Sequence, residues 1–289
     1  MISIQDHLEI CRFDRSDIQG LIDLSESVGW DYDRREIDTV LASGAIFGHK
    51  NVTGTIVSSA AIITYDSYIA SIGMVIVNPN YRGIGLAKEV TKRCMDLTAQ
   101  HTKVMLISTD EGKPLYERLE FKTVDFVHKY ISNKYVPLKI ANAENITIEN
   151  VEERDLEEII QLDAAAFGDQ RGQFLMTRIN QAEQSLVARN EQGEKVGFGL
   201  SILGSENLSI GPIVAADSIT AIRLIHELAR LHKGNLRIDV PANTIDHIKE
   251  SLQQSGFKKV RTPELMINNA DQMPQRNGQL YAIAAQIFG

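Results

Sequence analysis

Cysteine is scarce in this chain, and long hydrophobic runs are missing. Cys11 and Cys94 are the two cysteines, too few for a disulfide framework or a four-ligand zinc site, and the seven histidines are dispersed, so no metal site is predicted. No stretch approaches the roughly 20 apolar residues that cross a bilayer. The N-terminus also lacks a basic and then apolar secretory leader. We therefore expect a soluble, cytoplasmic protein with no membrane contact.

Positive charge is in short supply as well. Lys and Arg total 30 against 38 Asp and Glu, a net charge of −8. A phosphate backbone is held by basic surfaces, so nucleic acid is not expected as a partner, and an RNA- or ribosome-directed role is disfavoured. The acidic surplus lies mostly in the second half, because residues 1–140 hold 16 basic and 18 acidic residues. The first half is the better host for an anion.

The sequence contains an internal repeat. Its 289 residues suit two domains of roughly 140 residues each. The segment 17–24 matches 155–162 at an offset of 138, Ser71-Ile72-Gly73 matches Ser209-Ile210-Gly211 at the same offset, and Phe121-Lys122 matches Phe257-Lys258 at 136. Three matches in register predict a duplication. We place the domains at 1–138 and 146–289, with a linker at 139–145.

Each copy alternates strand and helix patterns. The order is a strand, a helix, a further helical stretch, two strands in a hairpin, a long strand, a helix, a strand, a helix and a final strand. This order predicts a mixed α/β fold in both copies.

The most informative stretch joins an apolar strand to an amphipathic helix. The strand breaks at Asn78-Pro79-Asn80, and the junction reads Arg82-Gly83-Ile84-Gly85-Leu86-Ala87-Lys88. Glycines there let backbone N–H groups approach a ligand, and a helix N-terminus favours a diphosphate. A turn that needs glycine only for its shape is the alternative. A dinucleotide fingerprint would need Gly at position 88, and the Gly-Lys-Ser/Thr of a P-loop is absent.

Two motifs together resemble the GNAT family of N-acetyltransferases. The junction has the family's R-x-x-G-x-A form, and 113–121 is similar to the family's segment of leucine, tyrosine, glutamate, lysine and a later glycine-phenylalanine pair, although Glu120 replaces the glycine. The resemblance covers roughly 58–129. It implies two tandem GNAT-like domains and acetyl-CoA as co-substrate. By resemblance, the backbone of Val75, Ile76 and Val77 pairs with pantetheine, the residues from Arg82 to Lys88 (Arg82, Gly83, Ile84, Gly85, Leu86, Ala87, Lys88) hold the diphosphate, and Thr109 stands where many members carry Asn.

Acyl transfer to an amine needs a proton donor for the departing thiolate. Tyr116 suits this role, because a phenol with a pKa of about 10 stays protonated at neutral pH, and the family uses its matching tyrosine this way. A tyrosine that only packs its ring on a helix is the alternative. No base is assigned: Asp66, Glu26 and a water chain stay open. Trp30, flanked by two aspartates, could receive a cationic amine or be buried in the core.

The second copy lacks these features. Residues 215–221 contain no Gly and no Arg but include Asp217, and Leu252 stands where the first copy has Tyr116. We therefore expect a degenerate C-terminal domain without a cofactor motif. The leading hypothesis is an enzyme that moves acetyl directly from acetyl-CoA to a primary amine of a small molecule or peptide. The alternative is a non-enzymatic acyl-CoA-binding or regulatory protein.

Overall fold

The computed structural model describes residues 8–138, here the first half, and 145–289, the second half. The predicted linker at 139–145 falls almost wholly outside the described residues. Both halves repeat the predicted order of elements, so the mixed α/β fold is confirmed. The first half contains β1 (Glu9–Phe13), α1 (Ile18–Glu26), α2 (Arg34–Ser43), β2 (Gly44–Lys50), β3 (Ile56–Thr64), β4 (Ile69–Val77), α3 (Leu86–Met95), β5 (Lys103–Ser108), α4 (Lys113–Glu117) and β6 (Lys122–Ser132).

The second half repeats this order and adds strands at its end. Its elements are β7 (Ile146–Asn150), α5 (Leu156–Phe167), α6 (Gly172–Gln181), β8 (Gln184–Asn190), β9 (Lys195–Leu203), β10 (Leu208–Ala215), α7 (Ser218–Ala229), β11 (Leu236–Pro241), α8 (Ala242–Gln254), β12 (Lys258–Arg261), β13 (Glu264–Asn268) and β14 (Leu280–Ala282). Short 3₁₀ turns lie at Arg15–Asp17, Pro79–Tyr81 and Glu153–Asp155.

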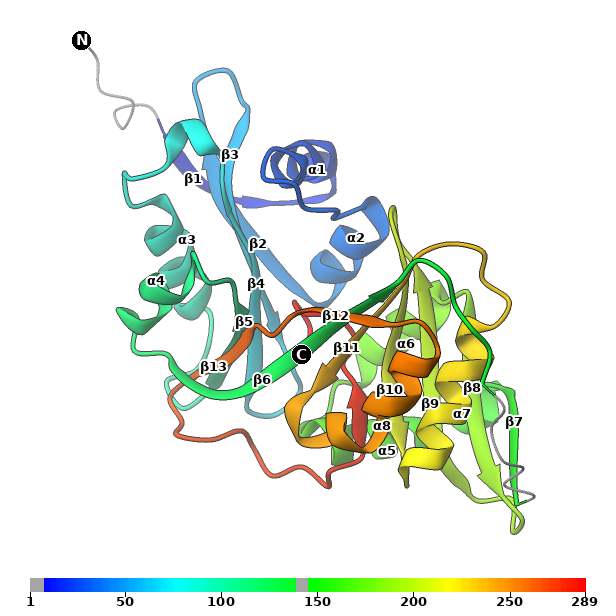
Figure 1. The fold of residues 1–289 in the computed structure, drawn as a ribbon. Coiled ribbons are helices and arrows are strands. Elements are labelled where there is room, and N and C mark those ends of the chain that lie inside the picture. The colour runs from blue at the N-terminus through cyan, green and yellow to red at the C-terminus, as the bar shows by residue number, and fades with distance from the viewer. Residues whose placement is uncertain (1–7, 139–144) are drawn as a thin grey trace.

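The two halves exchange strands. The described strands form one continuous sheet in the order β1-β2-β3-β4-β5-β13-β6-β11-β10-β9-β8-β7, with β12 on β6 and β14 on β10. β13 of the second half lies antiparallel between β5 and β6 of the first, while β6 also pairs antiparallel with β11 of the second (Figure 1). Each half therefore completes the sheet of the other, and removing residues after 138 would strip β13 from the first half.

The apolar end of the chain lies between the halves. The Ser71 hydroxyl donates to the Ile287 carbonyl at 2.8 Å, and the Tyr65 hydroxyl donates to the carbonyl of Phe288, whose side chain is fully buried. One hydrophobic cluster contains residues from both halves, including Ile46, Met105, Phe167 and Phe288. Burying a side chain of the size of Phe288 contributes roughly 1.5–3 kcal/mol, so this segment helps to fix the halves together.

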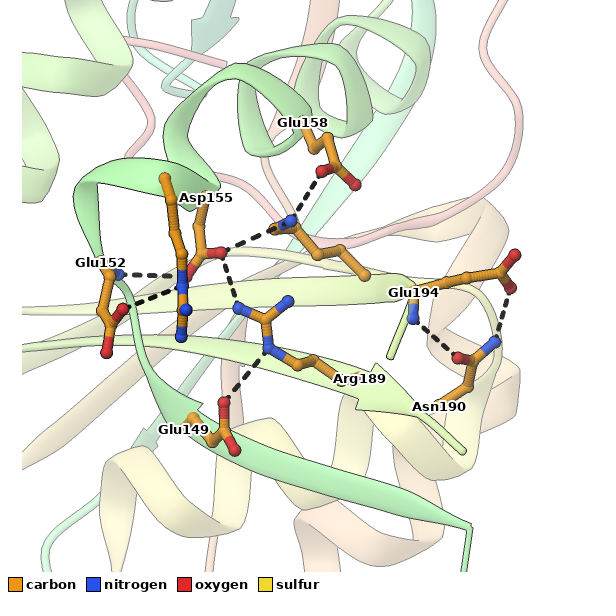
Figure 2. A network of polar contacts seen from close by, with 9 residues as sticks. Glu149, Glu152, Asp155, Glu158, Arg189, Asn190 and Glu194 are labelled. Carbon is orange, nitrogen blue, oxygen red and sulfur yellow. Dashed lines mark hydrogen bonds and ion pairs between the residues drawn. The ribbon is translucent and has the colours of Figure 1, made fainter. Parts of the chain in front are cut away.

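A buried carboxylate organises the start of the second half. Asp155 is fully buried, and its carboxylate accepts from the Glu152 backbone N–H at 3.1 Å and from Arg189 Nη2 at 2.6 Å. Figure 2 shows Arg189 reaching Glu149 as well, with Nε to Oε2 at 3.1 Å. Lys195 Nζ lies 3.4 Å from the same Asp155 oxygen. The contacts join the first turn of α5 to β7, β8 and β9.

Candidate functional site

β4 and β5 pair only over their first residues. The parallel register runs from Ile69 opposite Lys103 to Ile72 opposite Leu106. Beyond Ile72, β4 continues along β3 on its other side, and β5 continues along β13. The edge of β4 from Gly73 to Val77 that faces β5 therefore has no strand partner among the described residues. Val75, Ile76 and Val77, predicted to pair with pantetheine, lie on this open segment.

A bulge bends β4 at the mouth of this gap. Met74 and Val75 together stand opposite Ala60, because the register shifts between Ser59 and Ala61. Met74 has a φ of 50°, a conformation that side-chain-bearing residues rarely adopt, and the Ser59 hydroxyl donates to its carbonyl at 2.7 Å. Bulges re-aim backbone groups at functional sites. This bulge marks where the gap between β4 and β5 begins.

The glycine-containing junction leads from β4 into α3. Gly83 and Gly85 have φ values of 82° and 93°, and a Cβ at either would meet no atom within 4 Å. Both glycines are therefore required by their backbone conformation and leave open space above the loop. Gly85 is the N-cap of α3, and no side chain caps the helix there. The first N–H groups of α3 have no partner within the helix, as at every helix N-terminus.

Side chains of the junction divide between core and solvent. Leu86 is buried and fastens α3 to the core, while Ile84 and Ala87 are half-buried. Arg82 and Lys88 are exposed. Arg82 Nη1 lies 2.9 Å from Glu111 Oε1, and its Nε donates to the Val77 carbonyl at 3.5 Å. The Arg82 guanidinium thus spans the outer end of the gap, from the end of β4 to the loop after β5.

Tyr116 and Thr109 lie on the other side of the gap, after β5. Tyr116 is 7% exposed, and burial raises the pKa of its hydroxyl, which keeps the phenol protonated. The Tyr116 carbonyl accepts from the Phe121 N–H at 3.0 Å in a Schellman turn. A Cβ on Gly112 would lie 3.0 Å from the Tyr116 ring, so glycine permits the close packing. Thr109 Oγ1 accepts from the Gly112 N–H at 3.1 Å and shapes this turn.

A pocket lies between the halves. The first half contributes Asp31, Asp33, Arg35 and Glu36 to its wall. The second half contributes Arg178 from α6, Arg237 and Asp239 from β11, and the backbone segment 283–285. Trp30, the predicted acceptor contact, does not line this pocket. It packs on the hydrophobic cluster shared by the two halves, with its ring centroid 6.1 Å from that of Tyr32.

Glu36 lies in the first-half wall of the pocket, and Tyr32 lies beside that wall. Tyr32 stands between two pocket-lining aspartates and packs against the hydrophobic cluster that contains Met74 of the bulge. Burial raises the pKa of its hydroxyl, and the charge of Glu36 adds to this. Burial also raises the pKa of Glu36, and Arg178 and Arg237 oppose that shift. A carboxylate whose pKa is raised in this way is a candidate proton acceptor.

Glu36 was not found by sequence reasoning. Asp33 accepts from the Glu36 N–H at 2.9 Å and caps α2, and an aspartate three residues before a glutamate is a readable helix start. That signal places Glu36 in the first turn of α2, but the pocket it faces is completed by the second half. The two acids considered as bases, Glu26 and Asp66, are exposed. Asp66 accepts from the Gly172 N–H at 3.4 Å and does not line the pocket.

The corresponding gap in the second half is filled by the chain itself. β10 and β11 pair in parallel only from Leu208 to Ile210. β14 then runs antiparallel to β10, with Ala282 opposite Ile213, and the Ile283 N–H donates to the Asp239 carbonyl of β11 at 2.9 Å. In addition, Asp217 caps α7 by accepting from the Thr220 N–H at 2.8 Å. The gap between the parallel strands and the start of the following helix, which are both open in the first half, are therefore occupied in the second half by β14 and by the Asp217 side chain.

Comparison with known proteins agrees with this geometry. A family profile described as "Acetyltransferase (GNAT) domain" matches residues 34–139, and a second of the same description matches 159–282. The chain is 33% identical to the uncharacterized N-acetyltransferase YitH of Bacillus subtilis (strain 168) over 283 residues, 97% of this chain and 98% of that protein. This chain belongs to the GNAT acetyltransferase family.

Solved structures share the arrangement of the whole chain. A provisionally assigned acetyltransferase from Pyrococcus horikoshii superimposes with a TM-score of 0.79 at 20% identity, covering 98% of this chain and 96% of that one. A GCN5-related N-acetyltransferase from Sphaerobacter thermophilus gives 0.67 at 16% identity over 94% and 99%. A tandem GNAT protein from the clavulanic acid biosynthesis pathway gives 0.64 at 12% identity over 90% and 98%. The predicted tandem GNAT architecture is thus confirmed.

The described residues contain neither a membrane-spanning helix nor a metal-binding cluster. No helix in 8–138 or 145–289 has the length and apolar character needed to cross a membrane. Within the same ranges, no group of three or more His, Cys, Asp or Glu side chains is arranged to hold a metal ion.

Proposed function

We propose that this GNAT protein transfers acetyl from acetyl-CoA to a primary amine at a single site in the first half. The observation that carries the proposal is the gap between β4 and β5, which leaves the edge from Gly73 to Val77 unpaired. Pantetheine contains two amides and can bind such an edge as a further strand. This arrangement would leave the thioester at the bulge and the diphosphate at the uncapped start of α3.

The donor site has the polarity that acetyl-CoA requires. Backbone amides from Gly83 to Lys88 would hold the diphosphate, helped by the charges of Arg82 and Lys88. The Arg82 guanidinium would exchange its exposed contact with Glu111 for a phosphate oxygen, at small expense because exposed ion pairs contribute little. Thr109, which directly follows β5, would help to hold the bound cofactor.

The acceptor would reach the thioester from the pocket between the halves. The unprotonated amine nitrogen attacks the thioester carbonyl carbon, so one C–N bond forms and the C–S bond breaks. The amine loses one proton, for which we assign Glu36 as the acceptor, and the departing thiolate gains one, for which we assign Tyr116 as the donor. Backbone N–H groups at the bulge would stabilise the oxyanion. The step involves no oxidation or reduction.

The second half would not bind a second acetyl-CoA. β14 occupies the gap between β10 and β11, and Asp217 adds a negative charge at the helix start where a diphosphate would sit. Leu252, which stands in place of Tyr116, cannot donate a proton. The role we propose for this half is to complete the sheet through β13 and to form one wall of the acceptor pocket.

A calorimetric titration with acetyl-CoA tests this proposal. We expect one site per chain, followed by release of CoA when an acceptor amine is added. Two sites per chain would contradict the inactive second half, and no binding would contradict the acetyl-CoA site itself. Binding without turnover on a broad amine panel would instead favour a regulatory acyl-CoA-binding protein.

A further inference from the structure

The pocket between the halves contains a buried arginine that lacks an anion. Arg178 is 2% exposed, and its Nε has no hydrogen-bond partner. Its guanidinium lies 5.2 Å from the centroid of the Phe288 ring. Glu36 and Asp33 act on it electrostatically, yet neither lies within ion-pair distance. Burying a guanidinium without a partner is costly, so buried arginines are normally paired.

Arg171, the N-cap residue of the same helix, is a buried arginine that has a carboxylate partner. Its Nε donates to Asp163 Oδ2 at 2.7 Å and its Nη2 to Oδ1 at 3.0 Å, a two-pronged pair. Its Nη1 donates to the Phe288 carbonyl at 3.3 Å. The fully paired Arg171 faces the core, whereas the unpaired Arg178 lines the pocket. Arg178 thus combines a missing carboxylate partner with a place in the pocket wall, where a bound ligand can supply the anion.

The pocket is lined by charged groups of both signs, and each half contributes both: Arg35 lies among the first-half carboxylates and Asp239 beside the second-half arginines. The guanidinium groups of Arg178 and Arg237 come from the second half, and Arg237 Nε donates to Asp239 Oδ2 at 2.7 Å. The carboxylates of Asp31, Asp33 and Glu36 come from the first half. Tyr32, between Asp31 and Asp33, packs against the cluster that contains Met74 of the bulge, where acyl transfer would occur. A molecule bound in this pocket would therefore meet both carboxylates and guanidinium groups.

Resting on the proposed acetyltransferase function, we propose that the acceptor is an amine that also carries a carboxylate, and that Arg178 binds this carboxylate. The planar guanidinium matches a carboxylate with two parallel hydrogen bonds, and Arg237 adds positive charge beside it. The amine would then lie toward Glu36 and Tyr32. Arg178 acts in this scheme as a specificity-determining residue supplied by the half that has no donor site.

The test compares acceptors that differ only in the carboxylate. Free L-amino acids with a single carboxylate, including lysine, are assayed against their carboxamides with acetyl-CoA, and kcat and KM are measured separately. We expect kcat/KM to favour the free acids by tenfold or more, because hydrogen bonds to charged groups contribute about 1.5–3 kcal/mol. The carboxamide has the less basic amine and hence more of it unprotonated at neutral pH, so amine basicity cannot produce this preference.

Variants assign the preference to Arg178. In Arg178→Met, KM for a free acid should rise at least tenfold while KM for its carboxamide changes little, and Arg178→Lys should recover part of the difference. Arg276→Met is the matched control. Arg276 is a half-buried arginine whose Nη2 lacks a partner among the described residues and whose guanidinium lies 5.3 Å from the Phe167 ring centroid, but it does not line the pocket.

The outcomes separate this inference from the proposed function. Acetyl-CoA binding measured by calorimetry reports on the function alone. If acetyl-CoA binds and carboxamides are acetylated as efficiently as the free acids, or if no free acid is acetylated, the carboxylate inference is wrong while the donor site stands. Should Arg178→Met fail to fold, the comparison of acids and carboxamides on the unmodified protein decides the question.

Discussion

Tyr116 and Leu252 occupy the same position of the same turn in the two halves. The Phe121 N–H donates to the Tyr116 carbonyl at 3.0 Å, and the Phe257 N–H donates to the Leu252 carbonyl at 2.9 Å. Both turns end in a residue with positive φ, Glu120 at 65° and Gly256 at 87°. The duplication has therefore kept the backbone of this turn, and the tyrosine stands only in the half in which the gap between the two parallel strands is open.

Replacing Tyr116 by Phe tests the role of that hydroxyl. We expect kcat for acetyl transfer to fall about 100-fold, because a positioned general acid contributes factors of this order. The affinity for acetyl-CoA should change little, since the ring keeps its packing against Phe121 and Gly112. Steady-state kinetics and calorimetry measure the two quantities. Tyr130→Phe, at a buried tyrosine of β6, is the control and should retain full kcat; unchanged kcat in Tyr116→Phe would remove the assignment.

Glu36 should govern the acidic limb of the pH profile. Burial raises the pKa of Glu36, Arg178 and Arg237 oppose this, and Asp33 and Asp31 add to it. The carboxylate needed as proton acceptor is therefore lost at a higher pH than for an ordinary glutamate, and kcat/KM should rise with pH through this raised pKa. Glu36→Gln should lower kcat about 100-fold and flatten that limb.

Asp38→Asn is the control for Glu36, because Asp38 lies on the same helix but pairs with Arg15 at 3.5 Å, away from the pocket. Its pH profile should match that of the unmodified protein. A Glu36→Gln variant that keeps both the rate and the shape of the profile would show that water or the bulk solvent takes the proton.

The start of α3 can be given the cap that α7 already has. Gly85→Asp places a carboxylate at the uncapped N-terminus of α3, as Asp217 does for α7. We expect the Kd for acetyl-CoA to rise at least tenfold, because the charge would repel the diphosphate and compete for the helix amides. Gly85→Ala imposes the same backbone strain without the charge, and calorimetry on both separates the two effects. Equal affinities in the two variants would place the diphosphate elsewhere.

Glu120 adopts a backbone conformation that favours glycine. A left-handed φ costs a side-chain-bearing residue about 1–2 kcal/mol. Glycine avoids this cost, but it loses more conformational entropy on folding, which offsets part of the gain. Glu120→Gly should therefore raise the free energy of unfolding by roughly 1 kcal/mol in urea titrations. The reciprocal Gly256→Ala should lower it by more, since a Cβ there would lie 2.5 Å from the Lys134 carbonyl oxygen. A destabilised Glu120→Gly would mean that the glutamate side chain makes a compensating contact.

Local sequence was sufficient for the donor side of the site. Gly83, Gly85 and Tyr116 stand in short motifs whose physical reason is local, namely a positive φ before a helix and a phenol inside a helical turn. The repeat also predicted both copies of the fold.

The acceptor side could not be read in the same way. Glu36 precedes Arg178 by 142 positions and Arg237 by 201. The three residues line one pocket only because the halves pack together. The exchange of β6 and β13 was equally hidden, since the alternation of a strand predicts that it pairs but not with which half. Trp30, the single tryptophan, was a candidate acceptor contact, but it does not line the pocket.

The buried Asp155 should make the stability of the second half depend on pH. Burial alone would raise the pKa of Asp155, but the Glu152 backbone N–H, Arg189 and Lys195 outweigh it and leave the pKa lowered. A carboxylate with a lowered pKa in the folded state stabilises the fold above its unfolded pKa of about 3.9, and this stabilisation is lost as pH falls through the folded value. Asp155→Asn should lower the free energy of unfolding at pH 7 by about 3 kcal/mol, because Arg189 and Lys195 lose their buried partner.

Glu149→Gln is the matched control for Asp155→Asn. Glu149 binds the same Arg189 (Figure 2) but is half-exposed, with 52% of its side chain accessible, and exposed ion pairs contribute at most about 1 kcal/mol. Urea titrations at pH 7 and below pH 4 should show a large difference between the two variants at neutral pH that narrows in acid, because protonation removes the charge of Asp155 from the unmodified chain too. A difference that stayed constant across this range would indicate that Asp155 acts through its packing and not through its charge.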